Sequence, residues 1–528
     1  MRSCPSAARR RGGPAATAAA LISTMALALT ACGGASPGAG RPAASGKAGD
    51  TLTVAWSVAP QTLDPAKAVQ NDAYFDELAY EPLIVRRSDG SLAPGLAQSW
   101  AYTGTGNTTF VMHLRPGVKF ADGGALTAQG VADHLRYVLA SSGQMAPLLS
   151  GDTFTATDPS TVTITGTKPN PNLPIILTQD YVVGGVISPT GLHATGKLGT
   201  RTFGAGPYML DPAQTVDGDH YTYVPNPNYY DKASVHWHKV VIRVITDAQS
   251  VLNALKTGQA DVAGGDPSTV SAAAQAGLNV TGSPLLWSGV VLADRHGTLA
   301  KPLADVRVRQ ALNYATDRVA ITDALFGGVG KPTNQLTVPG GYGFDAALNG
   351  TYPHDVAKAK QLLAAAGYPN GFSLRIVTPE VQQLNLVAQA LEQQWKQVGV
   401  NLQITDYAND NQYVSDAFGA KFPAFMTAFG QLPLWMEGPS LYLPTASFNP
   451  FHVADPVLQA LFDREARSSG AEQTSLDQQI EGYLVHQAWF VPVVTTNLAY
   501  YARKTVTGTA TSAKAPLMEL YEIQPAAA

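Results

Sequence analysis

The side chains that most often perform catalysis or bind metals are sparse in this sequence. Of its 528 residues only Cys4 and Cys32 are cysteines, so the chain after Cys32 has no thiol nucleophile, no disulfide and no cysteine metal ligand. The ten histidines are scattered, and the pair in His236-Trp237-His238 has a spacing more typical of surface residues than of a chelate. The acids show no paired motif, although distant residues can meet in a fold. We therefore expect neither a cofactor nor a bound metal.

Two strings match chemical motifs without their structural context. The segment 34–38 fits G-x-S-x-G, but a nucleophile elbow needs a strand before it and a helix after it. The segment 191–197, GLHATGK, approaches a phosphate-binding loop, but Leu198 stands where serine or threonine is required. We assign chemistry to neither string.

Composition and length indicate a large globular protein. Hydrophobic residues make up 45% of the chain and charged residues 14%. The formal net charge of -4, with no dense basic run outside the N-terminus, gives no general attraction to nucleic acid. A chain of this length exceeds what one core organises, so we expect two or more lobes.

The N-terminus has the pattern of an export signal. A basic start with Arg2 and Arg9–Arg11 precedes an apolar stretch that ends in Leu29-Thr30-Ala31-Cys32. This ending resembles the lipobox of bacterial lipoproteins; the alternative is a secretory signal with an incidental cysteine. The resemblance implies a signal peptide over 1–31, lipid on Cys32 and an anchor on the outer face of the cell membrane. Export by the Sec or the twin-arginine route stays open. Residues 32–50, rich in Gly, Ala, Ser and Pro, predict a flexible tether.

Hydrophobic periodicity in the body predicts alternating strands and helices, and therefore α/β lobes. Alternating apolar residues predict strands near 52–56, 110–115, 241–245 and 400–404. The stretch 302–328 predicts two helices that start at Asp305 and Asp317, with Val308, Ala311, Leu312 and Ala315 on one face. We expect its Arg307 and Arg309 to have structural roles.

Many strings in order along the body resemble one family, the peptide/nickel-type (dipeptide and oligopeptide) extracellular solute-binding proteins of ABC importers. The resemblance runs from about Leu52 to Val506. Its strings are PQTLDPA, LAPGLAQSW, LRPGVKFADGGALTAQGV, FGAGPYML, NPNYY, NALKTGQADV, PLADVRVRQALNYATDR, HDVAKAKQLLAAAGY and WFVPVV.

This resemblance implies an α/β, two-lobed periplasmic-binding-protein-like clamp with an extra subdomain on the first lobe. It implies a monomeric binding protein, not an enzyme, that captures a peptide or similar solute outside the cell and passes it to a permease and ATPase complex. We expect lobe I over 51–293 with the extra subdomain at roughly 86–203, lobe II over 294–490, and a return to lobe I over 491–528. The chain would cross between lobes near 292–294 and 490–494.

The expected ligand site is aromatic and lies between the lobes. Its candidates are Trp287, Tyr342, Phe429, Trp435, Glu437 and Tyr442. Core packing is the alternative role for each of them. Peptide binders of the family usually carry an aspartate in the last of these regions, but between Asp416 and Asp455 the only acid here is Glu437. An oligopeptide held through its backbone, or another solute with apolar surface, therefore fits better than a dipeptide of fixed length.

Two other functions stay open at this point. One is a tethered extracellular hydrolase, which would need an acid, base or nucleophile cluster that the sequence does not reveal. The other is a solute or peptide receptor used for signalling, in which the same clamp would serve no import.

Overall fold

The computed structural model describes residues 51–327 and 329–527, which lie in one compact unit spanning Gly46–Ala528. The predicted signal peptide, tether and lipid-bearing Cys32 lie outside the described residues. Among the helices that are described, none is both long and apolar enough to cross a bilayer.

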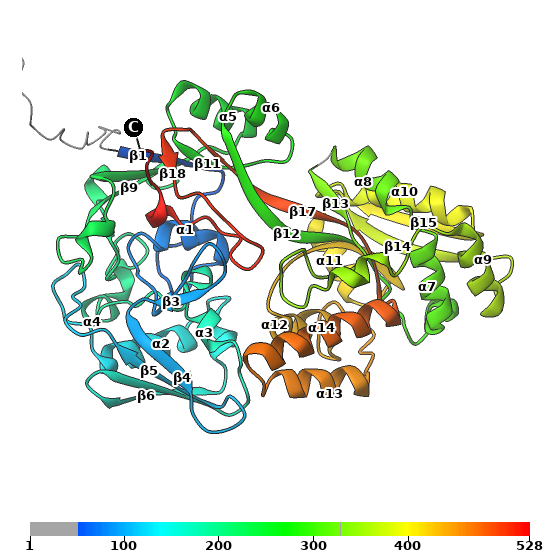
Figure 1. The fold of residues 1–528 in the computed structure, drawn as a ribbon, viewed down its shortest axis with the longest axis horizontal. Coiled ribbons are helices and arrows are strands. Elements are labelled where there is room, and N and C mark those ends of the chain that lie inside the picture. Colours follow the sequence, from blue (N-terminus) through cyan, green and yellow to red (C-terminus); the bar gives the residue numbers. More distant parts are fainter. Residues whose placement is uncertain (1–50, 328, 528) are drawn as a thin grey trace, which may run out of the picture. The chain divides into compact units, whose positions relative to one another are not determined.

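One large sheet runs through both lobes (Figure 1). Strands β1, β8, β9, β10 and β11 form its first-lobe part, and β14, β15 and β16 form its second-lobe part. In sheet order the strands are β15 (Val400–Tyr407), β14 (Phe372–Pro379), β16 (Ala424–Gly430), β12 (Asn279–Val291), β17 (Phe490–Ala502), β11 (Val262–Gly264), β1 (Thr51–Trp56), β10 (Lys239–Val244), β9 (His220–Pro225) and β8 (Tyr208–Leu210), with β13 (Gly330–Pro332) paired to β17.

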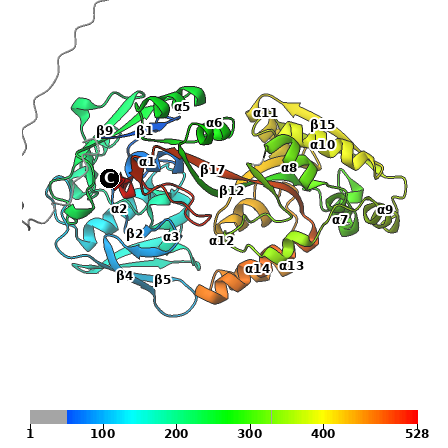
Figure 2. The same cartoon turned by 45° about the horizontal axis from the view of Figure 1, so that its top comes forward.

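Strands β12 and β17 join the two lobes. They pair antiparallel over their full lengths, from Asn279 opposite Ala502 to Val291 opposite Phe490. One end of the pair continues into β11 and the other into β16, and Figures 1 and 2 show the two strands running side by side from one lobe into the other. At Gly289 a Cβ atom would lie 2.2 Å from the carbonyl oxygen of Val491, so this close approach requires glycine.

The extra subdomain of the first lobe is a small antiparallel sheet covered by one helix. Strand β5 alternates buried residues with less buried ones, because one face of the sheet packs on helix α2 and its neighbours. The elements are β4 (Ala97–Tyr102), β5 (Thr109–Leu114), β7 (Thr161–Gly166), β6 (Asp152–Asp158) and α2 (Ala128–Ala140), with short pairs β2 (Ile84–Arg86) and β3 (Leu92–Pro94), and β18 (Val506–Thr507) and β19 (Gln524–Pro525) elsewhere in the lobe.

The remaining helices pack around these sheets, and the alternation of helices and strands confirms the predicted α/β class. In the first lobe they are α1 (Ala73–Asp76), α3 (Leu173–Ile176), α4 (Pro189–Leu192), α5 (Ala248–Thr257) and α6 (Val270–Gln275). In the second lobe they are α7 (Val306–Tyr314), α8 (Arg318–Phe326), α9 (Val356–Ala365), α10 (Leu384–Lys396), α11 (Asp410–Phe418), α12 (Leu434–Glu437), α13 (Pro456–Glu465) and α14 (Gly470–Gln487).

The predicted helix pair at 302–328 is confirmed as α7 and α8. The side chain of Asp305 accepts a hydrogen bond from the backbone N–H of Arg307, and that of Asp317 accepts one from Ala320, so both predicted caps form. The four predicted face residues are fully buried in the core of the second lobe.

Two arginines of this pair hold the second lobe together through backbone carbonyls. Arg309 donates to the carbonyl of Gln487 at the end of α14 at 2.9 and 3.1 Å, which confirms its expected structural role. Arg318 donates to Pro492 of β17 at 2.7 Å and to Thr333 at 2.9 Å. Burial lowers the pKa of Arg318 to about 9, so it remains a cation near neutral pH. Arg307 instead pairs with Asp305 at the surface.

Replacing Arg318 with methionine should destabilise the protein by about 3 kcal/mol or more, because several buried carbonyl oxygens would lose their donor. Urea unfolding followed by circular dichroism measures the effect. The exposed Arg307→Met is the matched control and should leave the unfolding midpoint in place. Equal midpoints for the two variants would contradict the role given to Arg318.

Candidate functional site

A cavity of about 320 Å³ lies where both lobes meet β12. This volume is in the range of pockets that hold small molecules. Stretches of chain that are far apart in sequence build its walls, and they come from four parts of the fold. From the first lobe come Gln70, Arg86, Asp180 and Tyr181; from β12 Leu285 and Leu286; from the second lobe Tyr342 and Phe429–Pro433; and from the C-terminal segment Ala513, Lys514, Pro516 and Leu517.

A buried ion pair forms the first-lobe wall. Arg86, the last residue of β2, places its Nε 2.9 Å from Oδ2 of Asp180, and both side chains are buried. Gln179 fixes the backbone of Arg86, accepting from its N–H at 3.0 Å and donating to its carbonyl at 2.6 Å. Burial opposes the charge of Arg86, but Asp180 raises the pKa of the guanidinium above its ordinary value. Arg86 is therefore a fixed cation at the cavity.

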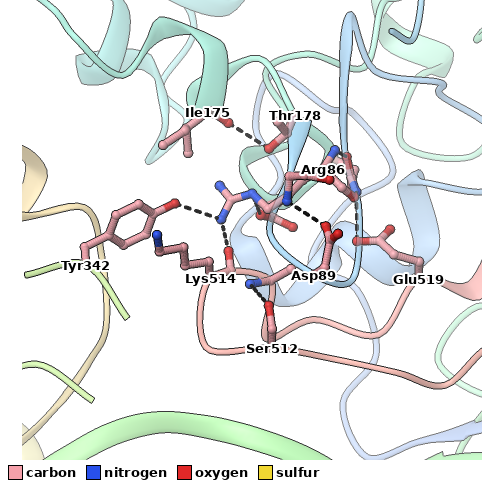
Figure 3. Close-up of polar contacts among 12 residues, drawn as sticks. Arg86, Asp89, Ile175, Thr178, Tyr342, Ser512, Lys514 and Glu519 are labelled. Atoms are coloured by element: carbon pink, nitrogen blue, oxygen red, sulfur yellow. Dashed lines mark hydrogen bonds and ion pairs between the residues drawn. The ribbon is translucent and has the colours of Figure 1, made fainter. Parts of the chain in front are cut away.

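Tyr342 brings the second lobe to this wall (Figure 3). Its hydroxyl lies 3.4 Å from Nη1 of Arg86, which also donates to the backbone carbonyl of Lys514. The ammonium of Lys514 lies 5.3 Å from the centroid of the Tyr342 ring, a cation–π distance. One aromatic side chain of the second lobe thus contacts two cations of the first.

The opposite wall is the end of β16 and the turn after it. Gly430 pairs with Leu286 of β12, and the N–H of Gln431 donates to the carbonyl of Leu285 at 2.8 Å. The side chain of Gln431 is fixed as well, since its Oε1 accepts from the N–H of Val338 at 2.9 Å. The wall is therefore held by backbone and side-chain hydrogen bonds, and it carries no charge.

Of the six residues predicted for the site, Tyr342 and Phe429 line the cavity. Trp287 lies one strand away, opposite Phe429 in the sheet, and is fully buried with its ring edge-to-face against Phe490 at 5.7 Å. A role in binding stays a prediction for all six.

Glu437 and Tyr442 form a buried pair behind the wall. The Tyr442 hydroxyl lies 2.9 Å from Oε2 of Glu437, and Oε1 of Glu437 accepts from the N–H of Leu432 at 3.0 Å. Leu432 lines the cavity, so this pair positions the turn that forms the wall. Burial raises the pKa of Glu437 from 4.5 to about 8, and the carboxyl is mostly protonated near neutral pH.

Trp435 lies where the lobes touch outside the cavity. It is partly buried against the core of the extra subdomain, which Met436 enters directly. A second contact of this kind is made by Asn107, in the turn between β4 and β5. Its side-chain amide donates to the carbonyls of Ala466 at 3.1 Å and Ser468 at 2.8 Å. Trp435 thus lies at a contact between the lobes and does not line the cavity.

Arg86, Asp180 and Lys514 are site residues that the sequence did not reveal. Arg86 follows the apolar run 83–85, and a charge directly after such a run is a weak sign of a residue at a strand end. Lys514 carries no comparable signal. Only the fold brings the two together across 428 positions of sequence.

Comparison with known proteins gives consistent results. The family profile "Bacterial extracellular solute-binding proteins, family 5 Middle" matches residues 91–448. The glutathione-binding protein GsiB of Shigella dysenteriae is 28% identical over 481 residues, which cover 85% of this chain and 89% of that protein.

Two solved structures share the fold. HbpA2 of Haemophilus parasuis has a TM-score of 0.80 at 22% identity, covering 90% of this chain and 100% of the other. The ABC transporter substrate-binding protein CtaP of Listeria monocytogenes has a TM-score of 0.76 at 21% identity, covering 90% and 99%. At these identities the two structures show the fold alone.

Glu437→Gln tests the protonation of the buried pair. Because the pKa of Glu437 is raised on folding, its protonation contributes stability that is complete below about pH 4.5 and is lost as the pH rises through about 8. Glutamine does not titrate, so the unfolding free energy of the variant relative to wild type should rise between about pH 5 and about pH 8, by on the order of 3 kcal/mol. Denaturant titrations at the two pH values measure this, with the exposed Glu472→Gln as control. If the difference in unfolding free energy between Glu437→Gln and wild type is the same at both pH values, Glu437 is not protonated as described.

Proposed function

The chain belongs to the bacterial extracellular solute-binding proteins of family 5, and from this premise we propose that it captures a peptide or similar solute at the outer face of the cell membrane, held there by lipid on Cys32, for an ABC importer. The family makes it a substrate-binding protein and not an enzyme. The lipid anchor, the permease and ATPase complex as partner, and a monomeric state are parts of the proposal.

The cavity at the lobe junction is the observation that supports this function best. Its walls come from both lobes, so a solute inside it would touch both at once. A ligand with more contacts in one arrangement of the lobes than in another shifts the population toward that arrangement. Binding would therefore favour the closed clamp, the form that an importer can distinguish from the empty one.

We assign different roles to the six predicted site residues. Tyr342 and Phe429, which line the cavity, contact the solute. Glu437 and Tyr442 position the turn at Leu432, Trp287 supports the strand of Phe429, and Trp435 acts at the contact between lobes. For the lobes we keep the proposed boundaries 51–293 with 491–528 for lobe I and 294–490 for lobe II.

The relative GsiB suggests the first ligands to test. It is a glutathione-binding protein, and glutathione is a tripeptide, which fits the size of the cavity better than a long chain. Glutathione and unmodified tripeptides are therefore the starting probes.

Phe429→Ala should weaken binding of such a tripeptide about tenfold or more, because an aromatic wall of the cavity is lost. Isothermal titration calorimetry measures the affinity, and native mass spectrometry of the purified protein identifies any solute that copurifies. Leu386→Ala, which truncates an exposed side chain on α10, is the control and should bind like wild type. Equal affinities for the two variants would rule out Phe429 as a contact.

Cys32→Ser tests the anchor in the producing cell. Without a thiol no diacylglyceryl group can attach, so the protein should move from the membrane fraction to the soluble fraction and lose labelling by a radioactive fatty acid. Cys4→Ser is the matched control, because Cys4 lies in the segment that would be removed. Membrane retention and labelling that survive Cys32→Ser would disprove lipid attachment at this residue.

A further inference from the structure

More positively than negatively charged residues line the cavity. Three residues of its lining carry charge, namely Arg86, Asp180 and Lys514. Arg86 and Asp180 neutralise each other at 2.9 Å, with each side chain only 4% exposed. Lys514 is left over, so the cavity has a surplus of one positive charge.

Lys514 has no carboxylate as counter-ion within 4.0 Å in the part of the chain that the structure describes. The ammonium instead faces the ring of Tyr342 (Figure 3). Its backbone is held in place by the bond from Arg86 to its carbonyl and by a tight turn in which Ser512 and Ala515 exchange backbone hydrogen bonds. The charge is therefore presented from a fixed segment.

Arg86, which lines the same cavity, has an unused donor. Its Nη2 is buried and has no hydrogen-bond partner in the described chain, while Nη1 is shared between Lys514 and Tyr342. A buried donor without an acceptor costs free energy, and an oxygen of a bound solute would recover it. The guanidinium of Arg86 and the ammonium of Lys514 both contact Tyr342, and such groups are the usual protein partners of a carboxylate or phosphate.

The cavity offers an ammonium no acid whose charge is free. The second-lobe wall, Tyr342 and Phe429–Pro433, carries no acid, and the charge of Asp180 is paired with Arg86 through Oδ2, although its Oδ1 is buried without a hydrogen-bond partner in the described chain. Asp477 of α14 is an acid on which the charge of Lys514 acts, but it does not line the cavity. Its burial, with Glu465 nearby, raises its pKa to about 8, so it is mostly neutral at physiological pH.

We propose that the cavity selects solutes with a carboxylate or a similar compact anion, bound by Lys514 and Arg86, and that it does not require a free amino group. This rests on the proposed solute-binding function and narrows its substrate class. A blocked or amine-free peptide acid, or another organic acid with an apolar body, meets these requirements. A peptide amide does not.

The test uses one tripeptide, Ala-Phe-Ala, in its free, N-acetylated and C-amidated forms, titrated calorimetrically into the wild-type protein. The N-acetyl acid should bind within about threefold of the free peptide, and the amide at least tenfold more weakly. Lys514→Gln should remove this preference and Lys514→Arg should keep it. Lys256→Gln, an exposed change of equal charge on α5, should bind like wild type. Equal binding of acid and amide, or loss of the N-acetyl form, would overturn the proposal.

If no form of the peptide binds, a second pair of probes tests the anion site at Lys514 and Arg86 separately from the proposal that the protein captures peptides. Succinate and succinamide differ in charge but little in size, and their binding is followed by the shift in melting temperature. Stabilisation by succinate alone that Lys514→Gln abolishes would support the anion site while refuting peptide capture. No response to either compound, with no peptide bound, would overturn both proposals.

Discussion

The pairing of β12 with β17 is the interaction on which the rest of the structure depends. These two strands carry the hydrogen bonding of one sheet from the first lobe into the second, so a change in the angle between the lobes must bend or twist this pair. Its register shifts between Pro284 and Leu286, next to two leucines that line the cavity. A bulge bends and twists a strand locally. The connection between the lobes and the floor of the cavity are thus the same few residues.

Buried arginines without acidic partners recur where distant segments of the second lobe converge. Arg295 stacks over Trp489 at 4.0 Å and donates to the carbonyl of Leu292 and to the amide oxygen of Asn449. Together with Arg309 and Arg318, it donates hydrogen bonds to backbone carbonyl oxygens at helix ends and in strands that regular secondary structure leaves without a donor. Arg86 differs in that it has an acidic partner and lines the cavity. This difference supports the binding role proposed for Arg86.

Local patterns in the sequence predict the fold far better than the site. The caps at Asp305 and Asp317 and the apolar face of α7 depend only on neighbours within one or two turns, and all are confirmed. The aromatic candidates could be named but not placed, because a tryptophan such as Trp287 has the same signature in a core as in a pocket. The contact between Arg86 and Lys514 at the cavity could not be predicted, because the two residues are 428 positions apart in sequence and meet only in the folded first lobe.

The most direct measurement is a crystal structure of the purified protein with its bound solute. The account predicts solute density in the 320 Å³ cavity, in contact with Tyr342 and Phe429 on one side and Arg86 and Lys514 on the other. Stoichiometric solute bound elsewhere, with this cavity filled only by water, would contradict it.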